Sequence, residues 1–254
     1  MQIKFQKDGG GYALETLEKS GVEGTAINKP FVFITGSNGS GKSALMRSIR
    51  SSVGLKGERD GTPFHITERQ SSMAPMPDEH PALLDLEALG WSNQKTYFFD
   101  SRATSAIAKA STFDDDDIFH HVSMIAGGGS RCSHGEFVGR DWWSALEWAI
   151  AKPEKGDAEK WLFLDEPETA IDSEKLIIGL ATLIEAAEVG HLRVFCASHS
   201  LLFASGLADN EKVQTIDLDE GIGWLATAKL AIDLSSNPEK LADLGKSIVE
   251  KLNR

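Results

Sequence analysis

The fold of this chain is decided by the stretch Phe31-Val32-Phe33-Ile34-Thr35, which runs directly into Gly36-Ser37-Asn38-Gly39-Ser40-Gly41-Lys42-Ser43. The first five residues are all aromatic or β-branched, and such a short apolar run predicts a buried strand. The next eight fit the pattern G-x-x-x-x-G-K-[ST], in which backbone N–H groups of a glycine-rich loop cradle phosphate groups. Apolar residues then recur at helical spacing, so we expect Lys42 and Ser43 to open a helix. A strand, a phosphate-binding loop and a helix are therefore predicted in succession.

Composition sets limits on the class of protein. The net charge of −12 argues against a generally basic protein that binds nucleic acid without sequence preference. The two cysteines, Cys132 and Cys196, are too few and too far apart for a disulfide framework. No stretch approaches eighteen apolar residues, and the first residues are too polar for a signal peptide. We therefore expect a cytoplasmic α/β protein with no transmembrane segment of its own.

Four apolar runs, including the one that precedes the glycine-rich loop, end in polar residues. Continuous rather than alternating hydrophobicity is typical of parallel strands that are covered on both faces. Ligands of open parallel sheets bind beyond the carboxyl ends of the strands, so we expect the polar endings to gather at one edge, around the phosphates. The three further runs are Thr96–Phe99 before Asp100, Trp161–Leu164 before Asp165, and Arg193–Ala197 before Ser198 and His199.

The carboxylate pair Asp165 and Glu166 is a candidate for catalysis of phosphoryl transfer. This chemistry needs Mg²⁺ held near the phosphates and a group that orients or deprotonates the attacking water. Asp165, together with the hydroxyl of Ser43, suits the metal, and Glu166 suits the water. His199 follows a buried strand, where a γ-phosphate contact and a structural role are both open. A surface Asp-Glu pair after a strand is the simpler alternative for Asp165 and Glu166.

These motifs together resemble those of the ABC-type ATPases. Gly36–Ser43 is similar to their Walker A motif, Leu162–Glu166 to their Walker B motif with its catalytic glutamate, Thr169–Asp172 to their D-loop, and His199 to their switch histidine. Cys132-Ser133-His134-Gly135-Glu136 is similar to a degenerate form of their signature motif. Such a signature resembles that of stand-alone prokaryotic and phage ABC-type ATPases and, more distantly, that of chromosome-maintenance and DNA-repair ATPases.

The resemblance implies a P-loop NTPase fold of the ABC ATPase type. Such a fold has a mixed, mainly parallel core sheet flanked by helices, an N-terminal antiparallel β part and a helical lobe. It implies one domain over residues 1–254, with the lobe that carries the signature inserted at about residues 55–150.

The resemblance also implies a function. ATP and Mg²⁺ are the expected cofactors, and Glu166, His199 and Lys42 the expected catalytic residues. ATP binding is expected to join two copies head to tail, so that the signature of each closes over the γ-phosphate of the other. DNA or an effector protein is the candidate partner. The residues expected to contact ATP are Gly36, Ser37, Asn38, Gly39, Ser40, Gly41, Lys42, Ser43, Ser133, Gly135, Glu136 and Asp172, and those expected to hold Mg²⁺ are Ser43 and Asp165.

Two other functions stay open. The chain could be the ATP-binding subunit of a membrane transporter, but the glutamine that such a subunit needs after the strand Thr96–Phe99 is replaced by Asp100-Ser101-Arg102. It could also be a nucleotide-dependent switch with negligible turnover, although the presence of Glu166 and His199 argues against this.

Three single features also have structural explanations. Asp172 precedes a helix and is suited to cap it. Tyr12 could stack on the nucleotide base or belong to the core. Asp114–Asp117 could suggest a metal site, but no EF-hand spacing is present, so we expect a solvated acidic loop.

Other elements follow from periodicity and turn residues. Strands are expected at 2–6 and 24–28, surface loops at about 54–81, helices at 136–150 and 173–188, and a hairpin of 212–217 with 222–226 around Asp219-Glu220-Gly221. The helix at 173–188 has Leu176, Ile177, Leu180, Leu183 and Ile184 as its buried stripe. A final helix after Asn237-Pro238 carries Leu241, Leu244, Ile248 and Leu252 on one face. We expect this face to pack on the core of the chain, and docking of a partner is the alternative.

Overall fold

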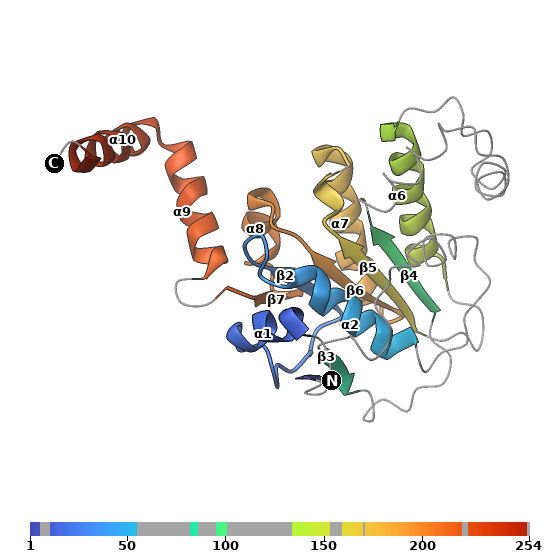
Figure 1. Cartoon of the computed structure of the whole chain (residues 1–254). Helices are drawn as coiled ribbons and strands as arrows, with labels where there is room; N and C mark the ends of the chain where they lie inside the picture. Colours follow the sequence, from blue (N-terminus) through green and yellow to red (C-terminus); the bar gives the residue numbers. More distant parts are fainter. Residues whose placement is uncertain are drawn as a thin grey trace, which may run out of the picture.

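The computed structural model of the chain describes residues 1–5, 11–54, 82–85, 95–100, 134–152, 159–169, 171–219 and 223–252. A five-stranded sheet forms the centre of this part, and every neighbouring pair of strands in it is parallel (Figure 1). The four predicted parallel strands are confirmed, and a fifth joins them. In spatial order the strands are β4 (Lys95–Asp100), β5 (Lys160–Asp165), β6 (Leu192–Ala197), β2 (Phe31–Thr35) and β7 (Val213–Asp217).

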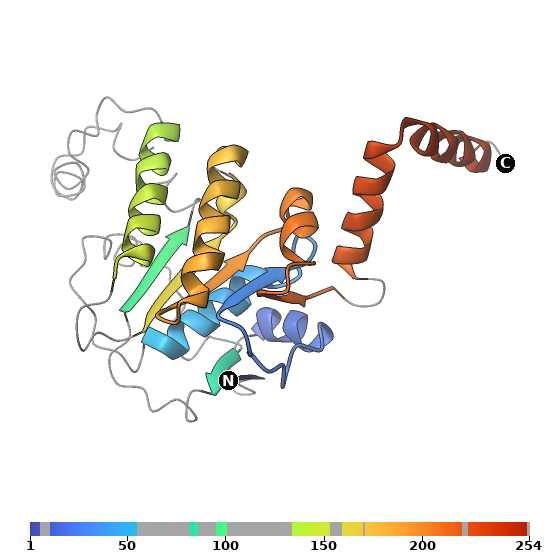
Figure 2. The same cartoon turned by 180° about the vertical axis from the view of Figure 1, so that it is seen from behind.

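Helices cover both faces of the sheet (Figures 1 and 2). Side chains alternate between the faces, so Phe31 and Phe33 of β2 pack with one group of helices while Val32 and Ile34 pack with the other. The result is an α/β fold of three layers, with an apolar core on each side of the sheet. The first face carries α6 (His134–Ile150), α7 (Ser173–Glu188) and α8 (Leu201–Leu207), and the second carries α1 (Gly11–Lys19) and α2 (Lys42–Gly54).

The carboxyl ends of the strands are level with one another. Ile34 of β2 and Asp165 of β5 both pair with Ala197 of β6, and Asp165 also pairs with Asp100 at the end of β4. The polar residues that follow these strands therefore lie along one edge of the sheet, as the sequence predicted. The residues between β3 and β4 and between β4 and α6, where much of the expected helical lobe falls, lie outside the described part.

A second, two-stranded sheet lies beside this core. In it β1 (Gln2–Phe5) pairs antiparallel with β3 (Ala82–Asp85). The predicted strand at 2–6 is thus present, whereas residues 24–28 contribute an isolated bridge between Gln2 and Ala26. The segment that follows β1 was not predicted to be helical, and it contains α1.

Helix α7 has the predicted bounds, but one residue of its stripe was predicted wrongly. Leu176, Leu180, Leu183 and Ile184 are buried, whereas Ile177 has 47% of its surface exposed. Gly179 and Ala187 complete the buried face of the helix.

The predicted hairpin after residue 212 is wrong. Residues 213–217 form β7, which pairs parallel with β2, and the chain then enters α9 (Trp224–Ser236) instead of returning as a strand. The Asp217 carboxylate accepts the backbone N–H of Leu225 at 2.8 Å, which satisfies a free donor at the start of α9. Gly223, with φ 77°, makes the sharp entry into this helix.

The final helix is confirmed, but its predicted packing is wrong. Helix α10 (Pro238–Leu252) begins where Asn237-Pro238 predicted. Leu241 and Leu244 are exposed instead of lying on the core. Within the described residues, no helix is both long and apolar enough to cross a membrane.

Candidate phosphate-binding and hydrolytic site

The glycine-rich loop joins the end of β2 to the start of α2. Gly36 and Gly41 have φ angles of 149° and 95°, which residues with a side chain rarely adopt. A Cβ on Gly36 would lie 2.5 Å from Ser40 Oγ, and one on Gly41 would lie 2.9 Å from a methyl carbon of Leu17. The tight curvature of the loop therefore requires glycine at both positions.

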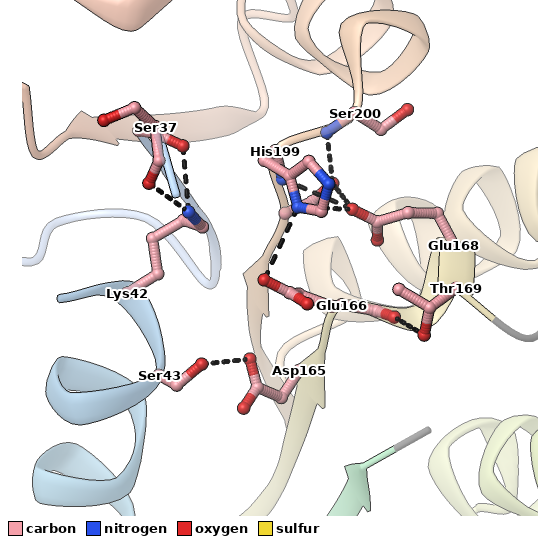
Figure 3. Close-up of polar contacts among 11 residues, drawn as sticks. Ser37, Lys42, Ser43, Asp165, Glu166, Glu168, Thr169, His199 and Ser200 are labelled. Atoms are coloured by element: carbon pink, nitrogen blue, oxygen red, sulfur yellow. Dashed lines mark hydrogen bonds and ion pairs between the residues drawn. The ribbon is translucent and has the colours of Figure 1, made fainter. Parts of the chain in front are cut away.

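The amino group of Lys42 returns across this loop (Figure 3). Its Nζ donates to the carbonyl oxygens of Gly36 at 2.9 Å and Ser37 at 2.8 Å. Burial lowers the pKa of Lys42, while nearby carboxylates, Glu166 first among them, act in the opposite direction. A cation is thus held against the backbone of the loop, where a phosphate group would need one.

Ser43 links the loop to the strand that carries the carboxylate pair. Its hydroxyl donates to Asp165 Oδ1 at 3.1 Å (Figure 3). An oxygen atom from the start of α2 and one from the end of β5 therefore lie next to each other. Mg²⁺ prefers such hard oxygen ligands and usually completes its shell with water and substrate phosphates. Among the described residues no three His, Cys, Asp or Glu side chains are grouped as a metal site. One hydroxyl and one carboxylate therefore fit Mg²⁺ bound together with phosphates.

Glu166 has an unusual backbone conformation. Its φ of 45° is in the left-handed region, which is costly for a residue with a side chain. Neighbours hold it there: its N–H donates to the carbonyl of Ala197 at 2.9 Å, and its carbonyl accepts the N–H of Thr169 at 3.1 Å and the hydroxyl of Thr169 at 3.0 Å. Strain that is fixed in this way is characteristic of functional positions.

His199 faces Glu166 across the end of β6. The distance from His199 Nδ1 to Glu166 Oε1 is 3.4 Å, and 37% of the histidine side chain is exposed against 7% of the glutamate. The predicted residues Lys42, Ser43, Asp165, Glu166 and His199 all lie at the same edge of the sheet (Figure 3).

Sequence reasoning missed Glu168, a second carboxylate beside His199. Its Oε1 accepts the hydroxyl of Ser198 at 2.6 Å and the N–H of His199 at 3.3 Å, and it lies 3.6 Å from His199 Nδ1. A short 3-10 turn (Pro167–Thr169) presents this side chain. The proline after Glu166 was the available signal, because it favours a turn that brings the next carboxylate back toward the site.

Sequence reasoning also missed Asp219 as a partner of the loop. Its carboxylate accepts the N–H of Ser37 at 3.0 Å and the hydroxyl of Ser37 at 2.8 Å. The segment after β7 is therefore hydrogen-bonded to the glycine-rich loop.

Asp172 acts as the helix cap that its position suggested. Its side chain accepts the N–H of Glu174 at 3.0 Å at the start of α7, and this bond is the main cause that lowers the pKa of Asp172. Asp172 also forms an exposed ion pair with Lys175 at 3.3 Å. These contacts give Asp172 a structural role within one chain, and this role does not need a bound nucleotide.

The remaining predicted site residues are only partly described. Gly135 and Glu136 lie in the first turn of α6, so the helix expected after the signature is present. Ser133 lies outside the described residues, as does the side chain of Tyr12. The acidic run 114–117 lies outside them too.

No protein-family model matches this chain, and no curated protein is significantly similar to it.

Proposed function

We propose that this protein binds Mg²⁺-ATP and hydrolyses it to ADP and phosphate in the manner of an ABC-type ATPase. The observation that carries the proposal is the hydrogen bond between Ser43 and Asp165, which joins the glycine-rich loop to the carboxylate pair. Glu166 and His199, 3.4 Å apart, stand beside this junction. A loop suited to phosphates, oxygen ligands suited to a metal, a carboxylate for the attacking water and a histidine beside it thus lie at one edge of the sheet.

The strand order supports the same proposal. Strand β6 lies between β5, which carries Asp165 and Glu166, and β2, which leads to the glycine-rich loop. His199 follows β6, so its side chain is placed between the carboxylates and the loop. A histidine in this place suits contact with the terminal phosphate.

Each residue has a distinct task in the proposed reaction. Lys42 and the backbone N–H groups of the loop stabilise the charge of the phosphates. Glu166 orients the attacking water and accepts its proton, and His199 donates a hydrogen bond to the terminal phosphate. Ser43 and Asp165 would hold Mg²⁺, which would supply charge neutralisation at the phosphates.

We further propose that ATP joins two copies head to tail, with DNA or an effector protein as the partner that uses the motion. Ser37, Asn38 and Gly39 of the loop are exposed, so this edge of the sheet is accessible to a second molecule. In the proposed dimer the segment around Ser133 of one copy closes the site of the other.

Phosphate release by the Lys42→Ala variant tests the catalytic assignment. We expect turnover to fall roughly a hundredfold or more, because the buried cation on the phosphates is lost. Lys212→Ala is the matched control, since Lys212 pairs with Glu185 on the surface and should leave turnover unchanged. Unchanged phosphate release by Lys42→Ala would refute the site. Nucleotide binding without measurable turnover in the wild-type protein would instead favour the switch module.

A further inference from the structure

The two C-terminal helices form an arm that stands away from the sheet (Figures 1 and 2). Ion pairs hold the arm at its joints. Lys229 of α9 pairs with Asp209, just after α8, at 2.7 Å, and Lys240 of α10 pairs with Asp233 of α9 at 2.8 Å. Both ion pairs are exposed, and helix α10 lies at the end of the arm.

Helix α10 presents an apolar stripe whose first half is exposed. Leu241 and Leu244 are 52% and 42% exposed. The sequence continues the same stripe through Ile248 and Leu252, at the spacing of one helix face. Exposed apolar stripes of this kind mark surfaces that bind a partner.

The charges of α10 indicate which partner fits. The helix contains three acidic and three basic residues and is neutral, in a chain with a net charge of −12. Its first half, residues 238–245, has one more acidic than basic residue, and its second half, residues 246–252, has one more basic residue. Two such helices in antiparallel orientation place opposite charges against each other. The acidic residues are Glu239, Asp243 and Glu250, and the basic residues are Lys240, Lys246 and Lys251.

A membrane surface fits this helix less well. Helices that lie on membranes are usually rich in basic residues on the polar face and carry aromatic residues on the apolar face. Helix α10 has no excess of basic residues and no aromatic residue.

We propose that α10 pairs antiparallel with α10 of a second copy, with the two apolar stripes facing each other. This pairing does not require nucleotide and is separate from the proposed ATP-dependent dimer. Two 15-residue helices bury less surface than the roughly 1,200–2,000 Å² of a standard interface, so the pairing is weak by itself. Its dissociation constant is expected to be on the order of 10 μM.

Sedimentation of the protein without nucleotide, over a range of concentrations, tests the pairing. The wild type should change from monomer to dimer, and Leu241→Glu with Leu244→Glu should raise the dissociation constant at least tenfold. Ala242→Glu is the matched control, because Ala242 is exposed on α10 but lies off the stripe. Circular dichroism checks that each variant remains folded. A wild type that stays monomeric at all concentrations, or a dimer that the leucine changes leave intact, would overturn the proposal.

Two variants of α10 with opposite charges test whether the partner of this helix is a second copy of the chain. Lys246→Glu with Lys251→Glu makes α10 strongly acidic, and Glu239→Lys with Asp243→Lys makes it strongly basic. Each double variant alone should be monomeric, and an equimolar mixture should recover the dimer. Failure of the mixture to associate contradicts antiparallel pairing. Because nucleotide is absent throughout, a negative result leaves the proposed ATPase reaction untouched.

Discussion

Glu166 shows how the surrounding residues fix the backbone of a single candidate site residue. A left-handed conformation costs a residue with a side chain about 1–2 kcal/mol. Hydrogen bonds with Ala197 on one side and Thr169 on the other hold Glu166 in this conformation. The direction of its carboxylate is therefore set by β6 and by the short turn after β5, both of which also position His199.

Glu168 is expected to act by positioning His199. It accepts the backbone N–H of His199 and the hydroxyl of Ser198, so Glu168→Ala should leave both donors without this acceptor. We expect kcat for ATP hydrolysis to fall about tenfold while KM for ATP changes little, because the loop that binds the phosphates is intact. Glu168→Gln keeps one acceptor oxygen and should retain more of the activity.

Steady-state phosphate release checks this prediction. Glu174→Gln is a suitable control, since Glu174 lies in the first turn of α7 and is exposed. Equal and small effects of Glu168→Ala and Glu174→Gln would show that the position of His199 does not depend on Glu168.

The contrast between Glu166 and Glu168 explains what sequence could predict at the site. Glu166 follows a buried strand directly, so the parallel arrangement of the strands was enough to place it. The place of Glu168 depends on the 3-10 turn, and that of Asp219 depends on the path of the chain after β7. Pro167 signals the turn that carries Glu168, but both contacts join segments far apart in sequence, and local patterns do not show which segment each carboxylate meets.

At the scale of elements, α6 and α7 are in close contact at one glycine. A Cβ at Gly179 of α7 would overlap the ring of Trp142, which is fully buried in α6. We expect Gly179→Ala to destabilise the fold by roughly 1–3 kcal/mol, because overpacking outweighs the gain in helix propensity.

Gly139→Ala is the matched control for this contact. Gly139 lies inside α6, and no other described segment comes within 4 Å of the place that a Cβ would take, so the change should stabilise the helix by about 0.5–1 kcal/mol. Denaturant unfolding measures both changes. If Gly179→Ala proves as stabilising as Gly139→Ala, the two helices do not pack as closely as described.

Elements could be predicted where one local signal was sufficient. Strand β5 is a continuous apolar run with clear ends, helix α7 has a clear helical period, and both were predicted within one residue. The segment 222–226 is short and apolar, which fits a strand or a helix equally well. In the structure β7 pairs parallel with β2, and Asp217 accepts a backbone N–H at the start of α9, so this segment enters a helix. Neither contact can be recognised from a short window of sequence.

At the scale of the whole molecule, two surfaces for a second copy are proposed, and they lie on different parts of the chain. The ATP-dependent surface is the edge of the sheet near the glycine-rich loop. The nucleotide-independent surface is α10, at the end of the arm (Figure 1). Changes at Leu241 and Leu244 should therefore weaken the pairing of α10 without affecting the ATP-dependent dimer, so the two can be measured separately.

Glu166→Gln is expected to trap the ATP-dependent dimer. The variant keeps the size of the side chain but loses the carboxylate that accepts the proton from water, so ATP should bind and persist. Light scattering with saturating Mg²⁺-ATP measures the mass, in a background that carries the two α10 leucine changes. Adding Ser133→Arg should return the protein to monomer, because a bulky cation then occupies the segment expected to close the opposite site. Monomers for Glu166→Gln under these conditions would argue against an ATP-closed dimer, since blocked hydrolysis removes the only proposed step that reopens it.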